Sequence, residues 1–477
     1  MDTIQTVMTH QTQAPIRVLQ YGEGNFLRAF VDQMLDIANE KGVFNGKIAI
    51  VKPIRFGSLE KFRKQENLYT VVLRGKENGQ VVDSSRVITS VADTLDAAED
   101  YEKYMALAKL ETLRFVVSNT TEAGIVLDVN DHFDGLPETY PGKLTKFLHA
   151  RFEAFDGAVD KGLILLPVEL IENNGGKLKE CVLALAKVWN LSEKFIDWVK
   201  NACIFCSTLV DRIVTGYPQD AAALCEKLGY EDELLDVGEP FALWVIESEK
   251  DIRSELPLDK AGLPVIFTDN QRPYRERKVR ILNGAHTSTV LAAFLAGKDI
   301  VRECMEDTVI STFMRKVVCD EVIPALPAGA TDSEAFAEAV FERFANPFID
   351  HKLLSISLNS VSKWKARCLG SFKDYLAKTG RLPKGLTFSF AALIAFYLGD
   401  GINGHEPYPI QDDQAVLDFF EKIRIQHQNA ADTVRTVAQN TAFWGEDLTE
   451  IDGFAAAVSA YLEDILTNGA YSAMENV

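Results

Sequence analysis

Apolar and polar residues alternate along the first half of the chain in a pattern of short strands and intervening helices. Apolar runs at 16–20, 47–51, 114–118 and 162–167 have strand length and are bounded by polar turns. Between the first two runs, apolar residues recur at helical spacing, at Phe26, Phe30, Met34, Ile37 and Ala38. Strands that alternate with helices in this way predict a parallel sheet with helices on both faces.

Two segments depart from this alternation. Residues 68–74 and 85–91 are strand-like, and the turn-like sequence Lys-Glu-Asn-Gly at 76–79 stands between them. This arrangement predicts an antiparallel hairpin that is inserted in the parallel sheet or appended to it.

From about residue 271 the pattern changes, because strand-like runs become scarce and long amphipathic stretches dominate. These stretches lie at 281–297, 303–325, 332–345, 352–369, 388–398, 413–440 and 452–468. Amphipathic repeats of this length predict helices. We therefore expect an α/β domain over residues 1–270 and a mostly α-helical domain over residues 271–477.

Composition narrows the class of protein. Of 477 residues, 47% are apolar, enough to fill large cores, and 69 acidic residues against 50 basic ones give a formal charge of −19. Such an acidic chain is not expected to bind nucleic acid or an anionic membrane surface. The first 15 residues carry no readable secretory signal, and the apolar run 388–398 is too short to span a bilayer. We expect a cytoplasmic protein.

The seven cysteines form no recognisable disulfide or zinc framework. Cys203 and Cys206 make one C-x-x-C pair, without the second pair of Cys or His ligands nearby that a structural zinc site requires. We expect ordinary buried thiols in a reducing compartment and no metal site.

A glycine turn follows the first predicted strand. Gly22 and Gly24 there would let a backbone approach a pyrophosphate, and the helix that follows offers free N–H groups. Leu27 occupies the position of the third glycine of the usual fingerprint, and a tight turn needs glycine for steric reasons as well. The second strand is followed by Lys52 and Arg55 and not by an acid, so these cations either face a 2′-phosphate or lie in solvent. The pattern indicates dinucleotide binding and leaves NAD and NADP open.

A second candidate site lies at the start of the helical half. If residues 278–286 are α-helical, Lys278, Asn283 and His286 share one half of the helix, with His286 between the other two. An amine that exchanges a proton with an alcohol oxygen, an amide that stabilises an alkoxide and an imidazole that orients the substrate suit carbonyl reduction. The alternative is a basic helix start with a core histidine and a capping asparagine.

Three further groups of polar residues are candidates for binding. Asn119 and Thr120 follow a predicted strand directly, at the edge where ligands bind in such sheets, although turn formation would select the same residue types. Asp211 stands next to an arginine, and a local ion pair is the alternative for it. Lys363 and Arg367 lie in a cationic stretch that either faces solvent or holds an anionic substrate group.

Taken together, these segments resemble the mannitol dehydrogenase family, the polyol-specific long-chain dehydrogenases. The resemblance runs over almost the whole chain and rests on GEGNFLRAF at 22–30, NTTEAG at 119–124, VDRI at 210–213, K-x4-N-x2-H at 278–286 and the stretch 359–363. It implies a Rossmann-type dinucleotide-binding N-terminal domain and a helical, catalytic C-terminal domain that binds the substrate. It further implies zinc-independent, NAD(H)-dependent chemistry on a small-molecule sugar acid. We expect the protein to act as a monomer or small homo-oligomer.

The resemblance also implies roles for individual residues. Lys278 would be the general acid/base, Asn283 would polarise the carbonyl and His286 would bind the substrate. Asp211 and Lys363 would contact the substrate, and we expect Arg367, in the same cationic stretch as Lys363, to bind it as well. The cofactor would be held by Gly22, Gly24, Asn25, Phe26, Arg28, Asn119, Thr120 and Glu122.

Two departures from the mannitol-type pattern favour a differently shaped, acidic sugar. Leu170 stands where such enzymes carry an asparagine that helps to hold the alkoxide, and Ser355 stands where they carry a substrate arginine. The implied reaction is the reduction of tagaturonate to altronate in hexuronate catabolism. Fructuronate and mannitol-type polyols are alternative substrates, and a dinucleotide-sensing regulator without turnover is an alternative from another class.

Overall fold

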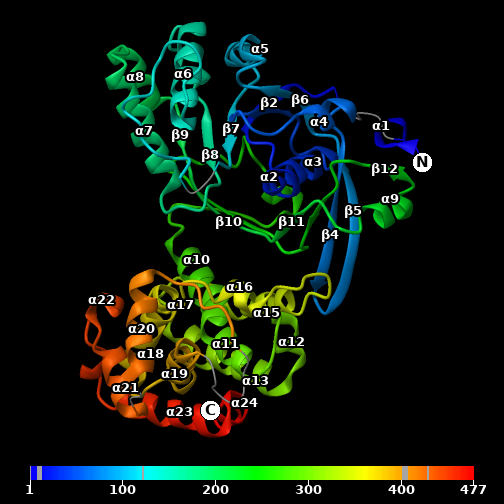
Figure 1. Ribbon diagram of the computed structural model, residues 1–477. Helices are drawn as coiled ribbons and strands as arrows, with labels where there is room; N and C mark the ends of the chain where they lie inside the picture. The colour runs from blue at the N-terminus through cyan, green and yellow to red at the C-terminus, as the bar shows by residue number, and fades with distance from the viewer. Residues whose placement is uncertain (1, 8–12, 121–122, 400–406, 427–428) are drawn as a thin grey trace. The chain divides into compact units, whose positions relative to one another are not determined.

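The structure is a computed structural model that describes residues 2–7, 13–120, 123–399, 407–426 and 429–477. It divides into two compact units, Met1–Arg74 with Val81–Gln271 and Gly75–Gln80 with Arg272–Val477. Figure 1 shows both, coloured from blue at the N-terminus to red at the C-terminus. The first unit contains most of the sheet-forming part of the chain, and the second contains the helical part.

A six-stranded parallel sheet forms the centre of the first unit. Its strand order is β6-β3-β2-β7-β8-β9, and all five neighbouring pairs are parallel. The strands are β2 (Ile16–Tyr21), β3 (Lys47–Lys52), β6 (Val91–Asp96), β7 (Phe115–Ser118), β8 (Ile164–Pro167) and β9 (Ile204–Phe205). The predicted parallel sheet is confirmed. Because β2 lies between β3 and β7, the strand order reverses beside β2, and sheets of this kind bind ligands in the crevice at that point.

Residues of the central strands alternate between two apolar layers. Val18 and Ile50 pack with α3 (Gln33–Glu40) on one face, whereas Leu19 and Val51 pack on the opposite face. The helices of that second layer are α5 (Tyr101–Ala106), α6 (Tyr140–Ala154), α7 (Asn174–Val188) and α8 (Glu193–Asn201). Figure 1 shows α6, α7 and α8 grouped beside β8 and β9. Helices on both faces explain why the strands are apolar along nearly their whole length.

The predicted hairpin is present but belongs to a separate sheet. β4 (Tyr69–Glu77) and β5 (Gln80–Ile88) are neighbours in a sheet of order β11-β13-β4-β5, together with β11 (Val214–Gly216) and β13 (Asp236–Gly238). The expectation that the hairpin joins the parallel sheet was wrong. β13 occupies the other hydrogen-bonding edge of β4, and Val91, assigned to the hairpin from its sequence, begins β6 of the parallel sheet.

Shorter elements complete the first unit. A three-stranded sheet has the order β10-β14-β15, and β1 pairs with β12. These strands are β1 (Asp2–Thr3), β10 (Ser207–Asp211), β12 (Tyr230–Glu231), β14 (Leu243–Glu247) and β15 (Val265–Thr268), and the short helices are α1 (Ile4–Val7), α2 (Asn25–Leu27), α4 (Glu60–Lys64) and α9 (Ala221–Leu228). Trp244 and Ile246 of β14 pack into the same apolar layer as α3. The three-stranded sheet was not among the elements predicted from the sequence.

Apart from the hairpin residues Gly75–Gln80, the second unit is mostly helical, as predicted for the second half of the chain. Its helices are α10 (Arg272–Arg277), α11 (Gly284–Leu295), α12 (Val301–Glu306), α13 (Thr308–Lys316), α14 (Ile323–Ala325), α15 (Ser333–Phe344), α16 (Leu353–Ile356), α17 (Ser360–Trp364), α18 (Gly370–Thr379), α19 (Lys384–Leu398), α20 (Gln414–Gln426), α21 (Ala430–Ala438), α22 (Thr441–Trp444), α23 (Phe454–Asn468) and α24 (Ala470–Glu475). The almost fully buried α19 packs against α11 and α23 at the centre. Within the ranges described, none of the chain's helices has both the length and the apolar character needed to cross a membrane.

Candidate active site

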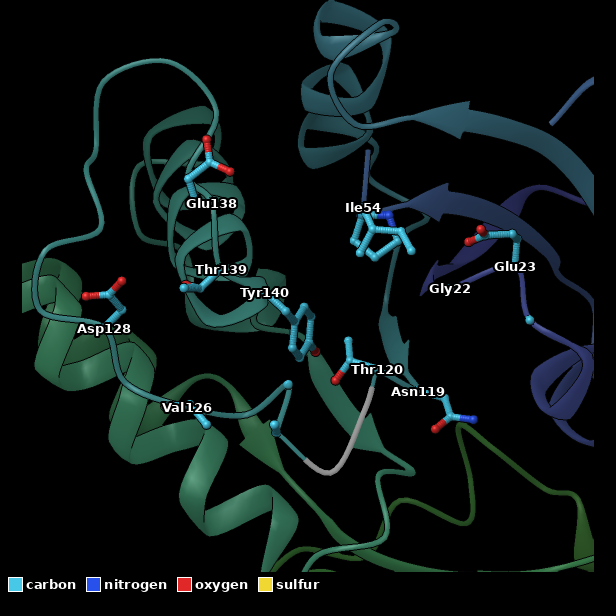
Figure 2. A pocket seen from close by; sticks show the side chains of 14 residues that line it. Gly22, Glu23, Ile54, Asn119, Thr120, Val126, Asp128, Glu138, Thr139 and Tyr140 are labelled. Carbon is cyan, nitrogen blue, oxygen red and sulfur yellow. The ribbon is translucent and has the colours of Figure 1, made fainter. Parts of the chain in front are cut away.

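A cavity of about 550 Å³ opens at the carboxyl end of β2 in the first unit. Four residues predicted to bind a cofactor line it, namely Gly22, Gly24, Asn119 and Thr120. The rest of its lining includes Glu23, Ile54, Val126, Asp128, Glu138, Thr139 and Tyr140, which Figure 2 shows around the pocket. The cavity therefore lies where the strand order reverses, and its volume is in the range of small-molecule sites.

The two glycines of the turn have different physical reasons to be glycine. Gly22 has a φ of +118°, and a β-carbon there would lie 3.3 Å from the carbonyl oxygen of Asn119. Gly24 stands immediately before α2, and a β-carbon on it would meet nothing within 4 Å. Gly22 thus allows the turn to pack against the end of β7, while Gly24 leaves its backbone open to a ligand. A glycine turn, a helix start and an adjoining cavity fit the pyrophosphate of a dinucleotide.

Glu169 supports the other side of this cavity. Its Oε1 accepts hydrogen bonds from the backbone N–H and the hydroxyl of Thr120, both at 3.0 Å, and its Oε2 accepts one from Ser118 Oγ at 3.2 Å. The side chain is 2% exposed, and Glu169 is the second residue after β8. Glu169 therefore ties the ends of β7 and β8 together and orients Thr120. Sequence reasoning did not select it; an acid two residues after a strand of the sheet was the available signal.

Three residues predicted to bind the cofactor do not line the cavity. Arg28 is 5% exposed and turns inward, where its guanidinium donates to the carbonyl of Leu234 and to Asn25 Oδ1, both at 2.6 Å. The ring of Phe26 stacks on Phe30 with centroids 4.9 Å apart. The structure thus gives Asn25, Phe26 and Arg28 contacts that shape the helix start. Glu122, the remaining cofactor candidate, lies outside the described residues.

The two cations after β3 are engaged by protein groups. Lys52 is 3% exposed, and its Nζ lies 2.7 Å from Asp96 Oδ2 and donates to the carbonyl of Ile54 at 2.8 Å. Arg55 is exposed and pairs with Glu138 at 2.6 Å. The idea that Lys52 is either solvated or aimed at a 2′-phosphate is wrong, because its ammonium is buried and already paired.

In the second unit, Lys278 and Asn283 begin and end a π-helical segment. The expectation of a regular α-helix at this point was wrong. A π-helix closes its hydrogen bonds from residue i to residue i+5, so one turn carries Lys278 to Asn283 and brings the two closer to one face than an α-helix would. Both side chains are partly exposed, and α11 continues directly from Asn283. π-Helical turns inside helices are frequent at functional sites.

His286 on α11 has a buried imidazole, one nitrogen of which is available to bond a ligand. It is 8% exposed, and its ring stacks on Phe344 with centroids 4.1 Å apart. Its Nε2 is buried and has no hydrogen-bond partner among the described residues. Burial holds the pKa of His286 well below its usual range, so the ring is neutral near pH 7. A neutral imidazole with an unpartnered nitrogen suits a hydrogen bond to a substrate hydroxyl.

Cationic groups surround His286. Four neighbouring basic side chains lower the pKa of His286 further, namely those of His351, Arg343, Arg367 and Lys363. Two of them, Arg367 and Lys363, were predicted to bind the substrate. Arg367 Nη1 donates to Thr287 Oγ1 at 3.3 Å, and Lys363 Nζ donates to the carbonyl of Ile356 at 2.8 Å. The structure thus brings a histidine and two predicted cations together, as a carboxylate-bearing substrate requires.

Arg343 and Phe344, at the end of α15, were not selected from the sequence. Arg343 is 6% exposed, and Phe344 provides the face on which His286 stacks. No spacing rule connects them with α11, so only the fold reveals this neighbourhood. Asp211, the remaining substrate candidate, ends β10 in the first unit and is 6% exposed. Among the described residues, no group of three or more His, Cys, Asp or Glu side chains is arranged to hold a metal ion.

Comparison with known sequences matches both halves of the chain. The mannitol dehydrogenase Rossmann domain matches residues 16–260, and the mannitol dehydrogenase C-terminal domain matches residues 270–466. The chain is 45% identical over 470 residues to altronate oxidoreductase of Enterobacter sp. (strain 638), with 97% of each chain covered. It is 43% identical over 474 residues to altronate oxidoreductase of Bacillus subtilis (strain 168), with 98% of this chain and 96% of the relative covered.

Solved structures share the fold. Mannitol 2-dehydrogenase of Pseudomonas fluorescens, in a ternary complex with NAD and D-mannitol, has a TM-score of 0.66 at 23% identity and covers 97% of this chain and 94% of its own. A substrate-free D-sorbitol dehydrogenase has a TM-score of 0.78 at 21% identity and covers 99% of this chain and 100% of its own. With the matched domains, these likenesses confirm the predicted fold class, a Rossmann-type domain followed by a mostly helical one.

Proposed function

The chain belongs to the mannitol dehydrogenase family of oxidoreductases, and on that premise we propose that it reduces tagaturonate to altronate with NADH, reversibly. The surroundings of His286 carry the proposal, because a neutral imidazole among cations suits a hydroxylated substrate that bears a carboxylate. The name altronate oxidoreductase, borne by relatives that span nearly the whole chain, supports the same substrate. The overall reaction is tagaturonate + NADH + H⁺ → altronate + NAD⁺.

Each candidate site residue of the second unit has a role in this proposal. NADH, when bound at the glycine turn, supplies the hydride that reduces the ketone carbon. The Lys278 ammonium gives a proton to the carbonyl oxygen as that oxygen becomes an alcohol, and the Asn283 amide donates a hydrogen bond to the same oxygen. His286 Nε2 bonds a substrate hydroxyl, while Arg367 and Lys363 hold the carboxylate.

The first unit supplies the cofactor half. Gly22 and Gly24 admit the pyrophosphate to the start of α2, and Asn119 and Thr120 line the same cavity, with Thr120 oriented by Glu169. Asp211 is assigned a polar role toward the substrate. No step of this route is assigned to a metal ion.

We place the reaction in the cytoplasm. All seven cysteine thiols are free, and six of them are buried, which suits a reducing compartment. The partner is a small sugar acid, and the proposed active species is a monomer or small homo-oligomer that binds neither nucleic acid nor membranes.

A substrate panel tests the proposal. NADH oxidation would be followed by absorbance with tagaturonate, fructuronate and fructose, and tagaturonate is expected to give the highest kcat/KM. Lys278→Ala should lower kcat by about 10²- to 10⁴-fold, the usual contribution of a general acid, whereas the solvent-facing Lys365→Ala serves as the matched control. NADH binding without oxidation by any sugar would favour the dinucleotide-sensing alternative, and full turnover by Lys278→Ala would contradict the mechanism.

A further inference from the structure

The strand that should supply an acid for the cofactor's ribose does not do so in this chain. In Rossmann-type folds, an acid about 20 residues after the glycine turn bonds the adenosine 2′-hydroxyl of NAD. Here β3 ends in Lys52, and the residues after it, Pro53, Ile54 and Arg55, contain no carboxylate. Yet this edge of the sheet borders the cavity that contains the glycine turn.

An acid reaches this edge from the glycine turn itself. Glu23 stands between the two glycines and lines the cavity, as Figure 2 shows. Its Oε1 lies 3.6 Å from the position that a β-carbon on Gly57 would take. Gly57 belongs to the loop after β3, so the Glu23 carboxylate extends from the first turn to the loop where the ribose acid is otherwise found.

The charges around Glu23 leave little attraction for an additional anion. Lys52 donates to the carbonyls of Ile54 and Phe56 and pairs with Asp96, so all three of its ammonium protons have protein acceptors. Lys143 is 4% exposed and donates to the carbonyl of Glu138 at 2.6 Å. Both lysines line a second cavity of about 460 Å³, which shares Pro53, Ile54 and Glu138 with the first.

Arg55 is the remaining cation of that second cavity. Its side chain is 79% exposed and already paired with Glu138. An exposed pair of this kind contributes little, so Arg55 alone is a weak receptor for a phosphate. The acids Glu23, Asp96 and Glu138 therefore meet a ligand here, and each of the three cations at this edge already contacts a protein group.

We propose that Glu23 selects NAD over NADP by accepting a hydrogen bond from the adenosine 2′-hydroxyl and by repelling a 2′-phosphate. The glycine turn thus has two functions. Gly22 and Gly24 leave space for the pyrophosphate, and Glu23 between them binds the 2′-hydroxyl of the ribose. The inference rests on the proposed function only in taking the bound cofactor to be a dinucleotide.

Direct binding tests it without turnover. NADH and NADPH would be titrated into the wild type by nucleotide fluorescence, with adenosine 2′,5′-bisphosphate as a competitor. We expect wild type to bind NADH more tightly. Glu23→Gln should reduce the ratio of the two Kd values at least about tenfold, as removal of one repulsive charge implies. Glu99→Gln, which removes an exposed carboxylate near Asp96, is the matched control and should leave the ratio unchanged.

The outcomes separate this inference from the proposed reaction. A wild type that prefers NADPH, or a Glu23→Gln variant that binds NADH with an unchanged ratio, overturns the role of Glu23. Glu23→Ala gives a second reading of the same ratio if Glu23→Gln folds poorly. Binding of neither nucleotide overturns both ideas, whereas NADH binding without reduction of any sugar acid overturns only the proposed reaction, and the ratio still decides the role of Glu23.

Discussion

The imidazole of His286 lies face to face with the ring of Phe344, with 4.1 Å between the centroids and 15° between the planes. The rings of His351 and His286 lie nearly perpendicular, at a centroid distance of 5.5 Å and 88° between the planes. Contacts with two neighbouring rings leave the imidazole little freedom to rotate. Phe344 therefore determines where the unpartnered Nε2 of His286 points.

Phe344→Leu should disturb the reaction more than the fold. Leucine keeps the site apolar but removes the stacked ring, an interaction worth about 0.5–1.5 kcal/mol. If the stacking energy helps to hold His286 in the orientation that binds the substrate, its loss should lower kcat/KM for tagaturonate by up to about tenfold. Steady-state kinetics and a thermal melt of the same preparation would measure both effects.

Phe313→Leu is the control for this substitution. Phe313 is 2% exposed and packs edge to face on Phe388, with centroids 5.3 Å apart, in the same unit. It should lower the melting temperature to a similar extent and leave kcat/KM nearly unchanged. Equal kinetic losses in both variants would show that Phe344 is only a core residue.

Glu169→Gln should weaken cofactor binding. The carboxylate accepts three hydrogen bonds, two of them from Thr120, and a glutamine side chain retains only one oxygen as an acceptor. A lost hydrogen bond to a charged group costs about 1.5–3 kcal/mol, so the KM for NADH should rise at least about tenfold with a smaller change in kcat. The exposed Glu180→Gln on α7 is the comparison variant. A selective loss of kcat would argue for a catalytic role of Glu169 instead.

The parts of the fold and site that could be predicted are those encoded in local pattern. Gly22 and Gly24 lie on a turn that adjacent residues in the sequence identify. The apolar runs of the parallel sheet are continuous because both faces of the sheet are buried. The turn at Lys278 was misjudged, because a π-helical turn adds a residue that a 3.6-residue period does not show. Phe344 and Glu169 were missed for another reason, since each acts on a residue distant in sequence that only the folded chain brings near.

Arg367→Met should separate acidic from neutral substrates. If Arg367 holds the substrate carboxylate, its removal should raise the KM for tagaturonate by about tenfold or more, since hydrogen bonds between charged groups contribute about 1.5–3 kcal/mol. Any activity on fructose, which has no carboxylate, should change little. Lys365→Met lies on the same π-helical segment, Lys365–Leu369, but faces solvent, and it provides the control. Equal losses with both sugars would contradict carboxylate recognition by Arg367.

Two buried carboxylates should make stability fall as pH rises toward neutrality. Asp32 is 0% exposed and accepts hydrogen bonds from the Tyr69 hydroxyl at 2.6 Å and from Gln20 at 3.4 Å. Burial raises its pKa from an ordinary 3.8 to about 7, and burial raises that of Asp236 to about 7 as well. Between about pH 4 and 7 the folded state thus binds more protons than the unfolded state, so the free energy of unfolding decreases across this range.

Asp32→Asn removes one of these titrations and mimics the protonated acid. Its melting temperature relative to wild type should therefore rise from pH 5 to about pH 7 and level off above it. Asp83→Asn is the control, because Lys227 holds the pKa of the Asp83 carboxyl below its usual range. The favourable contribution of Asp83 is fully present above pH 5, so that variant should show a constant difference from wild type. Thermal melts at four pH values would measure both, and a constant difference for Asp32→Asn would mean that Asp32 is already ionised at pH 5.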